Sequence, residues 1–295
     1  MKVALLQVGF EDRQPPDERR DEVARLAREL PSDVDLVVLP ELWGVGAFAA
    51  KRWADRAEPL RGPTYEFLAG LAGELGCAIH GGSIIEREDA ALRGGGADLH
   101  HDEGADLHHN EGAALQGGGA ELFNTALVVG SDGELLASYR KIHRFGAAGR
   151  EREILSAGTD PCVLDLPLRA GGSVPTGLAT CYDVRFPELF RVLSRRGARA
   201  LLVPGAWPSA RAEEIRLQLR TRALENQSVL LTCGIAGESG RTPMAGGSAI
   251  IRPNGQILAE AGAEPGVLVD EVDLGEIDRL REEFPVLEDR RLTEC

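Results

Sequence analysis

The chain has 295 residues, and 43% of them are hydrophobic, which is enough for the large core of one α/β domain. Its 33 basic and 47 acidic residues give a net charge of −14, which disfavours nucleic acid and anionic membranes as partners. Five widely spaced cysteines without a CxxC pair favour reduced thiols over a disulfide framework or a zinc knuckle. The chain lacks a signal-peptide pattern and a long apolar run, so we expect a soluble, cytoplasmic protein.

Predicted strands and helices alternate along the chain. The first half contains strands at 3–8, 35–40, 78–86, 122–129 and 133–142, with helices at 17–30 and 64–75. The second half contains a short strand before Cys181, a helix at 187–196, a strand at 200–205, a helix at 211–227, a strand at 228–237, a hairpin at 248–260, and a strand, helix and extended tail within 266–291. Tight Asp-Gly and Asn-Gly turns join several strands, which predicts mixed sheets with helices packed outside.

An insert at about 88–120 interrupts this pattern, where a short hairpin turn would suffice. Residues 96–111 read GADLHHDE–GADLHHNE, a tandem repeat flanked by GGG at 94–96 and 117–119. Four of the six histidines lie here: His100, His101, His108 and His109. Imidazoles beside carboxylates can bind zinc or nickel, but adjacent histidines in a glycine-rich loop have no rigid scaffold. We therefore expect a polar, flexible loop and no metal site.

Three segments place reactive side chains at the ends of apolar strands. Cys181 follows the short strand in GLATCYDVRFPEL, and Pro187 can start a helix just after it. A helix N-terminus there would lower the pKa of the exposed thiol and favour an oxyanion. Glu41 ends the run DLVVLPE, and Lys141 lies in SYRKIH. A carboxylate can take a thiol proton and an ammonium can hold a developing oxyanion, so the set suggests a cysteine amidohydrolase.

Each of these residues has a structural alternative. Cys181 could be a small buried hydrophobe, which is the interpretation we prefer for Cys77 and Cys233 in apolar strands and for Cys162 after a proline. Glu41 could cap the segment after Pro40, although burying a carboxylate without a partner is costly. Strand alternation places Arg140 and Lys141 on opposite faces, so one points inward while the other is solvated.

The three segments, in this order, resemble the nitrilase superfamily of carbon–nitrogen hydrolases. The matching motifs are LVVLPELW, YRKIH and CYDVRFPEL, and weaker matches cover most of the chain outside the insert, including MKVALLQ, FNTALVVGSDGELL, RALENQSVLLTCG, GGSAIIRPNGQIL and GVLVDEVDLGEIDRLREEFPVLEDR. The cysteine motif is most similar to that of small amidases such as the omega-amidases. True nitrilases and aliphatic amidases usually carry other residues after the cysteine. The resemblance implies one hydrolase domain over 1–295 with an α-β-β-α sandwich fold.

The resemblance also assigns roles to site residues. It selects Lys141 over Arg140, and it implies a second glutamate, for which Glu151 has the matching offset from Gly158 while Glu153 is its rival. Arg185 would meet a substrate carboxylate, the alternative being an ion pair with Glu188. The backbone N–H of Tyr182 would bind the oxyanion, and Trp207 would line either the pocket or the core. Arg222 and Glu225 are expected to form a structural pair.

The function implied is hydrolysis of a small carboxamide, such as a carboxylate-bearing omega-amide, through a thioester on Cys181. No metal or organic cofactor is expected, because the nucleophile is internal. An N-carbamoyl-amino-acid hydrolase or a nitrilase would use the same three residues, and a catalytically silent dimeric scaffold is the alternative outside the enzymes. The family usually pairs through its sheet sandwich, and the C-terminal segment, with Ile277, Leu280 and Phe284 on one predicted helical face, favours a homodimer as the smallest unit.

Overall fold

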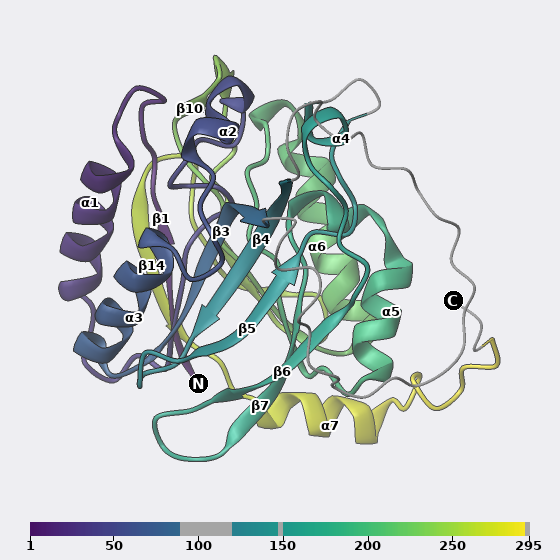
Figure 1. The fold of residues 1–295 in the computed structure, drawn as a ribbon. Coiled ribbons are helices and arrows are strands. Elements are labelled where there is room, and N and C mark those ends of the chain that lie inside the picture. The colour runs from purple at the N-terminus through teal and green to yellow at the C-terminus, as the bar shows by residue number, and fades with distance from the viewer. Residues whose placement is uncertain (89–119, 147–149, 293–295) are drawn as a thin grey trace.

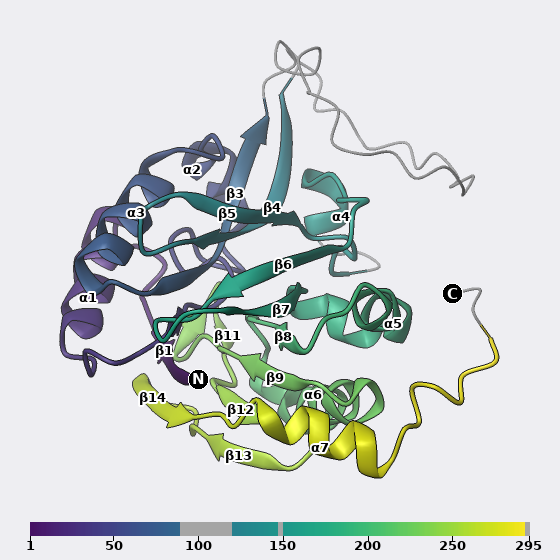
Figure 2. The same cartoon turned by 90° about the horizontal axis from the view of Figure 1, so that it is seen from below.

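Two six-stranded sheets face each other between layers of helices (Figures 1 and 2). The computed structural model describes residues 1–88, 120–146 and 150–292. Each sheet contains both parallel and antiparallel strand pairs. The predicted α-β-β-α sandwich with two mixed sheets is therefore confirmed. The histidine-rich repeat and its possible metal site lie outside the described residues.

The first sheet has the strand order β14-β1-β2-β3-β4-β5. Its strands are β14 (Gly266–Glu271), β1 (Lys2–Gln7), β2 (Leu36–Val38), β3 (Ala78–Glu88), β4 (Glu121–Val129) and β5 (Leu135–Arg140). Strands β1, β2 and β3 are parallel, whereas β14, β4 and β5 each run antiparallel to their neighbour. Because β4 reverses the direction and β5 reverses it again, β2, β3 and β5 end at the same edge of the sheet.

The second sheet has the strand order β13-β12-β9-β8-β7-β6 and repeats this design, with three central parallel strands. Its strands are β13 (Ile257–Glu260), β12 (Ala249–Ile251), β9 (Val229–Thr232), β8 (Ala200–Leu202), β7 (Ser173–Leu178) and β6 (Cys162–Pro167). The predicted hairpin around Asn254-Gly255 is the antiparallel pair β12–β13, and Gly255 has the positive φ of 77° that such a turn requires. A small hairpin, β10 (Glu238–Ser239) with β11 (Thr242–Pro243), stands apart.

Helices cover the two outer faces. Against the first sheet lie α1 (Pro16–Arg28) and α3 (Pro63–Leu75), and against the second lie α5 (Pro187–Arg195) and α6 (Ala212–Asn226) (Figure 1). The short helices α2 (Trp53–Arg56) and α4 (Arg150–Ile154) flank the strand ends, and α7 (Gly275–Glu283) follows β14. A proline in the first turn of α1, α3 and α5 supplies the φ angle that a helix start needs.

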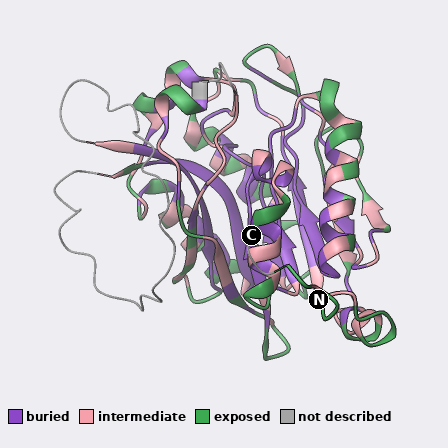
Figure 3. Cartoon of the chain, turned by 90° about the vertical axis from the view of Figure 1, so that its right-hand side faces the viewer, coloured by how far each residue is buried: buried purple, intermediate pink, exposed green. Residues whose placement is uncertain are grey.

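Strand alternation divides the core into layers, and buried residues fill both sheets (Figure 3). Val3 and Leu5 of β1 point between the sheets, whereas Ala4 and Leu6 point to the layer of α1 and α3. Three apolar layers result, one between the sheets and one on the outer face of each sheet.

The sequence did not predict the strand β6, the short helices α2 and α4, or the small hairpin β10–β11. The strand expected at 200–205 ends at Leu202, although Val203 and Gly205 still donate backbone hydrogen bonds to Leu231 and Cys233. No helix within the described ranges is long and apolar enough to cross a membrane.

Candidate active site

The carboxyl ends of strands from both sheets meet at one cavity of about 330 Å³. Glu41 follows β2, Lys141 follows β5, and Cys181 follows β7, and all three line this cavity. Active sites in α/β proteins commonly form where parallel strands end, because side chains of several strands converge there. The two sheets therefore contribute different halves of one site, with Glu41 and Lys141 from the first and Cys181 from the second.

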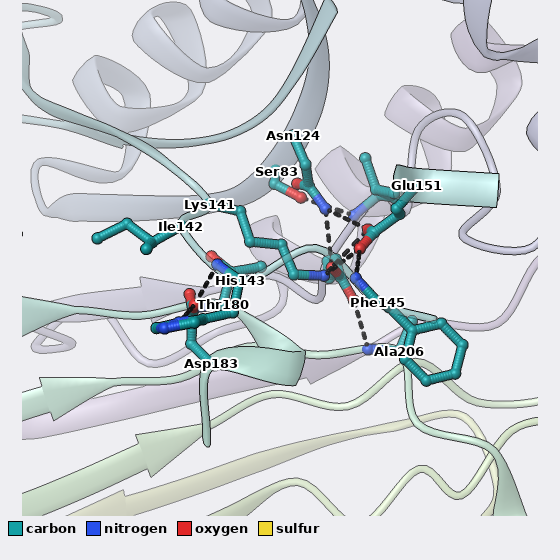
Figure 4. A network of polar contacts seen from close by, with 12 residues as sticks. Ser83, Asn124, Lys141, Ile142, His143, Phe145, Glu151, Thr180, Asp183 and Ala206 are labelled. Atoms are coloured by element: carbon teal, nitrogen blue, oxygen red, sulfur yellow. Dashed lines mark hydrogen bonds and ion pairs between the residues drawn. The ribbon is translucent and has the colours of Figure 1, made fainter. Parts of the chain in front are cut away.

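Lys141 forms the centre of a buried ion-pair cluster (Figure 4). Its Nζ lies 2.8 Å from Oε1 of Glu41 and 3.0 Å from both carboxylate oxygens of Glu151. Burial lowers the pKa of Lys141, but the charges of Glu151 and Glu41 outweigh it and raise the pKa well above its ordinary value. Burial, followed by the charge of Glu41, raises the pKa of Glu151, although Lys141 acts against this. Lys141 is thus held as a cation out of water.

Amide groups hold both carboxylates of this cluster in place. Asn124 of β4 donates from Nδ2 to Oε1 of Glu41 at 2.8 Å and to Oε1 of Glu151 at 3.2 Å. The backbone N–H of Ala206 donates to Oε2 of Glu41 at 3.0 Å, and that of Phe145 donates to Oε2 of Glu151. Buried charges persist when their lone pairs are satisfied in this way. Each glutamate is therefore fixed by contacts from more than one segment.

A close approach of the backbone explains where Glu151 lies. The Gly158 N–H donates to the carbonyl of Lys141 at 2.9 Å, and a Cβ on Gly158 would lie 2.0 Å from the carbonyl oxygen of Arg140. Only glycine permits this contact. The segment from α4 to Gly158 therefore packs directly on the backbone at the end of β5. This packing places Glu151, at the start of α4, within hydrogen-bond distance of Lys141. Glu153, by contrast, is exposed.

Cys181 begins a 3₁₀ turn, Cys181–Arg185, with a positive φ of 49°. Leu42, directly after Glu41, has the same φ, and such strained positions in non-glycine residues cluster at functional sites. The sequence predicted an exposed thiol with a lowered pKa, and this prediction is wrong. Cys181 is 8% exposed, and burial, the charge of Glu41 and a hydrogen bond to Glu41 raise its pKa well above normal. Lys141 lowers this pKa but is outweighed.

A second buried carboxylate, Asp183, ties the cysteine turn to the loop after β5. Its Oδ1 accepts the backbone N–H of His143 at 3.0 Å and lies 2.7 Å from Nδ1 of the same histidine (Figure 4). Its Oδ2 accepts the Tyr139 hydroxyl at 2.8 Å and the Thr180 N–H at 2.9 Å. Phe186 stacks on the His143 ring with centroids 3.7 Å apart. Asp183 thus links the segments that carry Lys141 and Cys181.

Aromatic and cationic side chains also line the cavity. Tyr182, Arg185, Trp207 and Arg211 line it. Arg185 does form an ion pair, which was the alternative to substrate binding, but its partner is Glu214 at 3.2 Å and not Glu188. Trp207 is buried in the core layer below α6, and it also lines the cavity. It therefore has both of the roles, in the core and in the pocket, between which the sequence left a choice.

The structure thus brings together Glu41, Lys141, Glu151 and Cys181, with Tyr182, Arg185 and Trp207 around the same cavity. The expected pair of Arg222 and Glu225 is present at 2.6 Å.

Arg140 points away from Lys141 as predicted. It is not simply solvated, however, because it binds Glu86 and Glu88 and lies over the Phe123 ring. Sequence reasoning missed Asn124, Asp183 and Arg211. No group of three or more histidine, cysteine, aspartate or glutamate side chains that could hold a metal exists in the described ranges.

Comparison with known proteins places the chain in a family. Residues 2–282 match the carbon–nitrogen hydrolase family. The chain belongs to this family of amidases. The hydrolase is 32% identical to the 2-oxoglutaramate amidase of Paenarthrobacter nicotinovorans over 291 residues, which cover 99% of this chain and 90% of that one.

Solved structures agree with the hydrolase over its whole length. A CN-hydrolase superfamily protein from Xanthomonas campestris, with an arsenic adduct in its active site, matches with a TM-score of 0.81 and 26% identity, covering 100% and 98% of the two chains. The amidase of Nesterenkonia sp. AN1, solved as a mutant with butyramide, matches with a TM-score of 0.74 and 27% identity, covering 97% and 96%. The recognition of the nitrilase superfamily from sequence motifs is therefore confirmed.

Proposed function

We propose that this amidase hydrolyses a small carboxamide carrying a carboxylate, an omega-amide, to the acid and ammonia. The observation that carries the proposal is the charge layout of one cavity. The cysteine and the Lys141 cluster are buried in the cavity wall, whereas the Arg185 side chain is 23% exposed, so we take the first as the inner end of the cavity and the second as its outer end. A guanidinium suits the bidentate binding of a carboxylate, so it can hold the acid end of such a substrate. The similarity to a 2-oxoglutaramate amidase supports the same substrate class.

In the first half of the reaction, the amide is cleaved. Glu41 accepts the Cys181 thiol proton as sulfur attacks the amide carbon, and a C–S bond forms. Lys141 and the Tyr182 N–H stabilise the oxyanion of the tetrahedral intermediate. The raised thiol pKa means that proton transfer must accompany attack, since little free thiolate exists beforehand. When the intermediate collapses, the C–N bond breaks and Glu41 returns its proton to the leaving ammonia.

In the second half, water resolves the thioester. Glu41, again a carboxylate, takes a proton from water as the water oxygen attacks the thioester carbon. The C–S bond breaks, the acid leaves, and the proton returns to Cys181. Glu151 acts through Lys141, because its carboxylate binds the same ammonium that Glu41 binds. No step calls for a group from outside the chain other than water.

The direct test is ammonia release from three substrates by the purified protein. They are 2-oxoglutaramate as an anionic omega-amide, butyramide as a neutral amide, and an N-carbamoyl amino acid. We expect a higher kcat/KM for the anionic amide than for butyramide. Ammonia together with carbon dioxide from the carbamoyl substrate, at a higher kcat/KM, would instead favour the carbamoyl hydrolase that shares these residues.

A catalytically silent scaffold is the other alternative, and thiol labelling separates it from an enzyme. In an amidase, iodoacetamide should alkylate Cys181 rapidly and in a pH-dependent way, because Glu41 takes the thiol proton as sulfur attacks, and an excess of substrate should slow this alkylation. Equally slow alkylation of Cys181 and of Cys233, which lies fully buried between the sheets, would favour the scaffold.

We also propose a cytoplasmic homodimer. The four cysteines within the described ranges are free, as a reducing compartment would keep them. On α6, Leu217 and Leu224 are 64% and 54% exposed, and their spacing of seven residues places them on one outward face. Phe284, at the end of α7, is also 64% exposed. Such exposed apolar side chains support pairing between copies of the chain.

A further inference from the structure

At the outer end of the cavity, one carboxylate joins two arginines. Oε2 of Glu214 accepts a hydrogen bond from Nη2 of Arg185 at 3.2 Å and from Nη1 of Arg211 at 2.9 Å. Both arginines line the cavity that contains Cys181. The three residues come from separate positions, since Arg185 ends the cysteine turn, Arg211 directly precedes α6, and Glu214 lies in the first turn of α6.

Glu214 is well placed to remain charged in this arrangement. Hydrogen bonds from Arg211 and then from Arg185 lower the pKa of its carboxyl. A negative charge in the first turn of a helix also interacts favourably with the helix dipole. Glu214 therefore draws two cations together and holds them at the same edge of the cavity, although like charges would otherwise separate them.

The two ends of the cavity then carry opposite formal charge. At the inner end, the one cation Lys141 and the two carboxylates Glu41 and Glu151 leave one negative charge in excess. At the outer end, two arginines and the single carboxylate Glu214 leave one positive charge in excess. The single carboxylate of such a substrate is attracted by the positive charge of the outer end and repelled by the negative charge of the inner end. The layout directs the uncharged amide toward Cys181 and the carboxylate outward.

The arginines also retain donors for a ligand. Among contacts within the described ranges, Arg185 uses Nη2 and Arg211 uses Nη1 for hydrogen bonds, and both bonds go to Glu214. Cζ of Arg185 lies 5.8 Å from the centroid of the Tyr182 ring, within the range of a cation–π contact. The remaining N–H groups of the two guanidinium groups can therefore be directed at an incoming carboxylate.

We propose that Arg211 is a specificity-determining residue that binds the substrate carboxylate together with Arg185, with Glu214 holding the two guanidinium groups in position. The ligand class is an amide with one carboxylate at the end far from the scissile bond. This inference rests on the proposed omega-amidase function, and it adds a second cation from a different segment. It does not depend on the roles of Glu41, Lys141 and Cys181 in the chemical step.

The test compares Arg211→Ala with Arg216→Ala in the full-length protein. Arg216 is the matched control, because it is also a half-exposed, ion-paired arginine, but it binds Glu260 and does not line the cavity. For each variant, kcat and KM are measured with 2-oxoglutaramate and with butyramide. We expect Arg211→Ala to lower the selectivity for the anionic amide about tenfold, through KM and not kcat, as loss of a charged hydrogen-bond donor predicts.

Arg211→Lys should recover part of this selectivity, since the charge returns without the planar fork. Arg216→Ala should keep the selectivity of the wild type. If the wild type prefers the anionic amide and Arg211→Ala retains that preference, the assignment of Arg211 is wrong while the proposed function stands. If the wild type hydrolyses butyramide as well as the anionic amide, the proposed substrate class fails and this inference fails with it.

Discussion

The carboxylate of Asp183 lies 2.7 Å from Nδ1 of His143, and this contact joins the two halves of the site. Asp183 is two residues after Cys181, and His143 is two residues after Lys141, so each partner is rigidly connected to one proposed catalytic side chain. Asp183 is fully buried and also accepts the Tyr139 hydroxyl and two backbone N–H groups. The distance between nucleophile and cation thus depends on a carboxylate that contacts neither.

Asp183→Asn should therefore impair positioning. Whichever way the amide faces, its NH₂ group meets a backbone N–H, that of His143 on one side or of Thr180 on the other. A buried unpaired donor costs about 1–3 kcal/mol, so the free energy of unfolding should fall by that amount. We expect kcat to fall more than tenfold with KM little changed, and alkylation of Cys181 to slow. A variant that loses stability but keeps wild-type kcat would show that Asp183 is merely structural.

Replacing Glu41 by glutamine should separate thiol ionisation from turnover. The amide can neither accept nor return a proton, so kcat/KM should fall by at least about a thousandfold. The charge of Glu41 raises the pKa of the Cys181 thiol, and Lys141 lowers it. Removing the carboxylate should therefore lower the thiol pKa and shift the pH profile of iodoacetamide alkylation to lower pH. A shift to higher pH, or none, would contradict the coupling of Glu41 to Cys181.

The glutamate pair of α4 offers a matched comparison. Glu151→Gln removes a buried charge 3.0 Å from Lys141, whereas Glu153→Gln changes an exposed residue two positions away. Losing one partner of a buried ion pair is strongly destabilising, by about 3–5 kcal/mol, so Glu151→Gln should lower both stability and kcat. Glu153→Gln should match the wild type in thermal unfolding and in steady-state kinetics. The reverse result would make Glu153 the second glutamate.

The parts of the site that could be predicted are those that end strands. Glu41 and Cys181 follow apolar runs, and a charged or reactive side chain at that position stands out against its neighbours. Asn124 lies within the apolar strand β4 and resembles an ordinary core polar residue, although its side chain reaches two carboxylates. Arg211 was missed because only the fold of the chain before α6 brings it to the cavity.

Properties that depend on how deeply a residue is buried could not be predicted from the sequence either. The turn after β7 predicted the place of Cys181 correctly, but the direction of its pKa shift depends on how much protein covers it. The burial comes from residues of the second sheet and of α5 and α6, and the charge of Glu41 comes from the opposite sheet, so no local sequence pattern reports either of them. The edge strand β6 was also missed, because it ends in Pro167 and pairs with β7, which contains Pro175, and prolines within a run argue against a strand.

Deletion of residues 94–118 should leave activity and melting temperature close to those of the wild type. The ladder of β3 and β4 continues to the pair of Glu88 and Glu121, so the two strands end side by side and a short connection can join them. Shortening a loop changes its closure entropy only slowly. Steady-state kinetics and thermal unfolding of the deleted protein provide the check. A large loss of activity, or rescue of the wild type by added zinc after chelation, would give the repeat a functional role.

The assembly prediction concerns the outward face of α6. The helix α7 buries Ile277 in the inter-sheet core but leaves Phe284 exposed, so the predicted apolar face of this helix is only partly used within the chain. Leu217 and Leu224 likewise contribute nothing to the described core. We expect light scattering to give about 63 kDa, twice the 31.6 kDa of one chain. Leu224→Glu should shift the protein toward the monomer by placing a charge in the contact, whereas Glu213→Gln, which removes a charge at an exposed position of the same helix, should leave the dimer intact. A wild-type monomer that stays active at nanomolar concentration would refute the dimer.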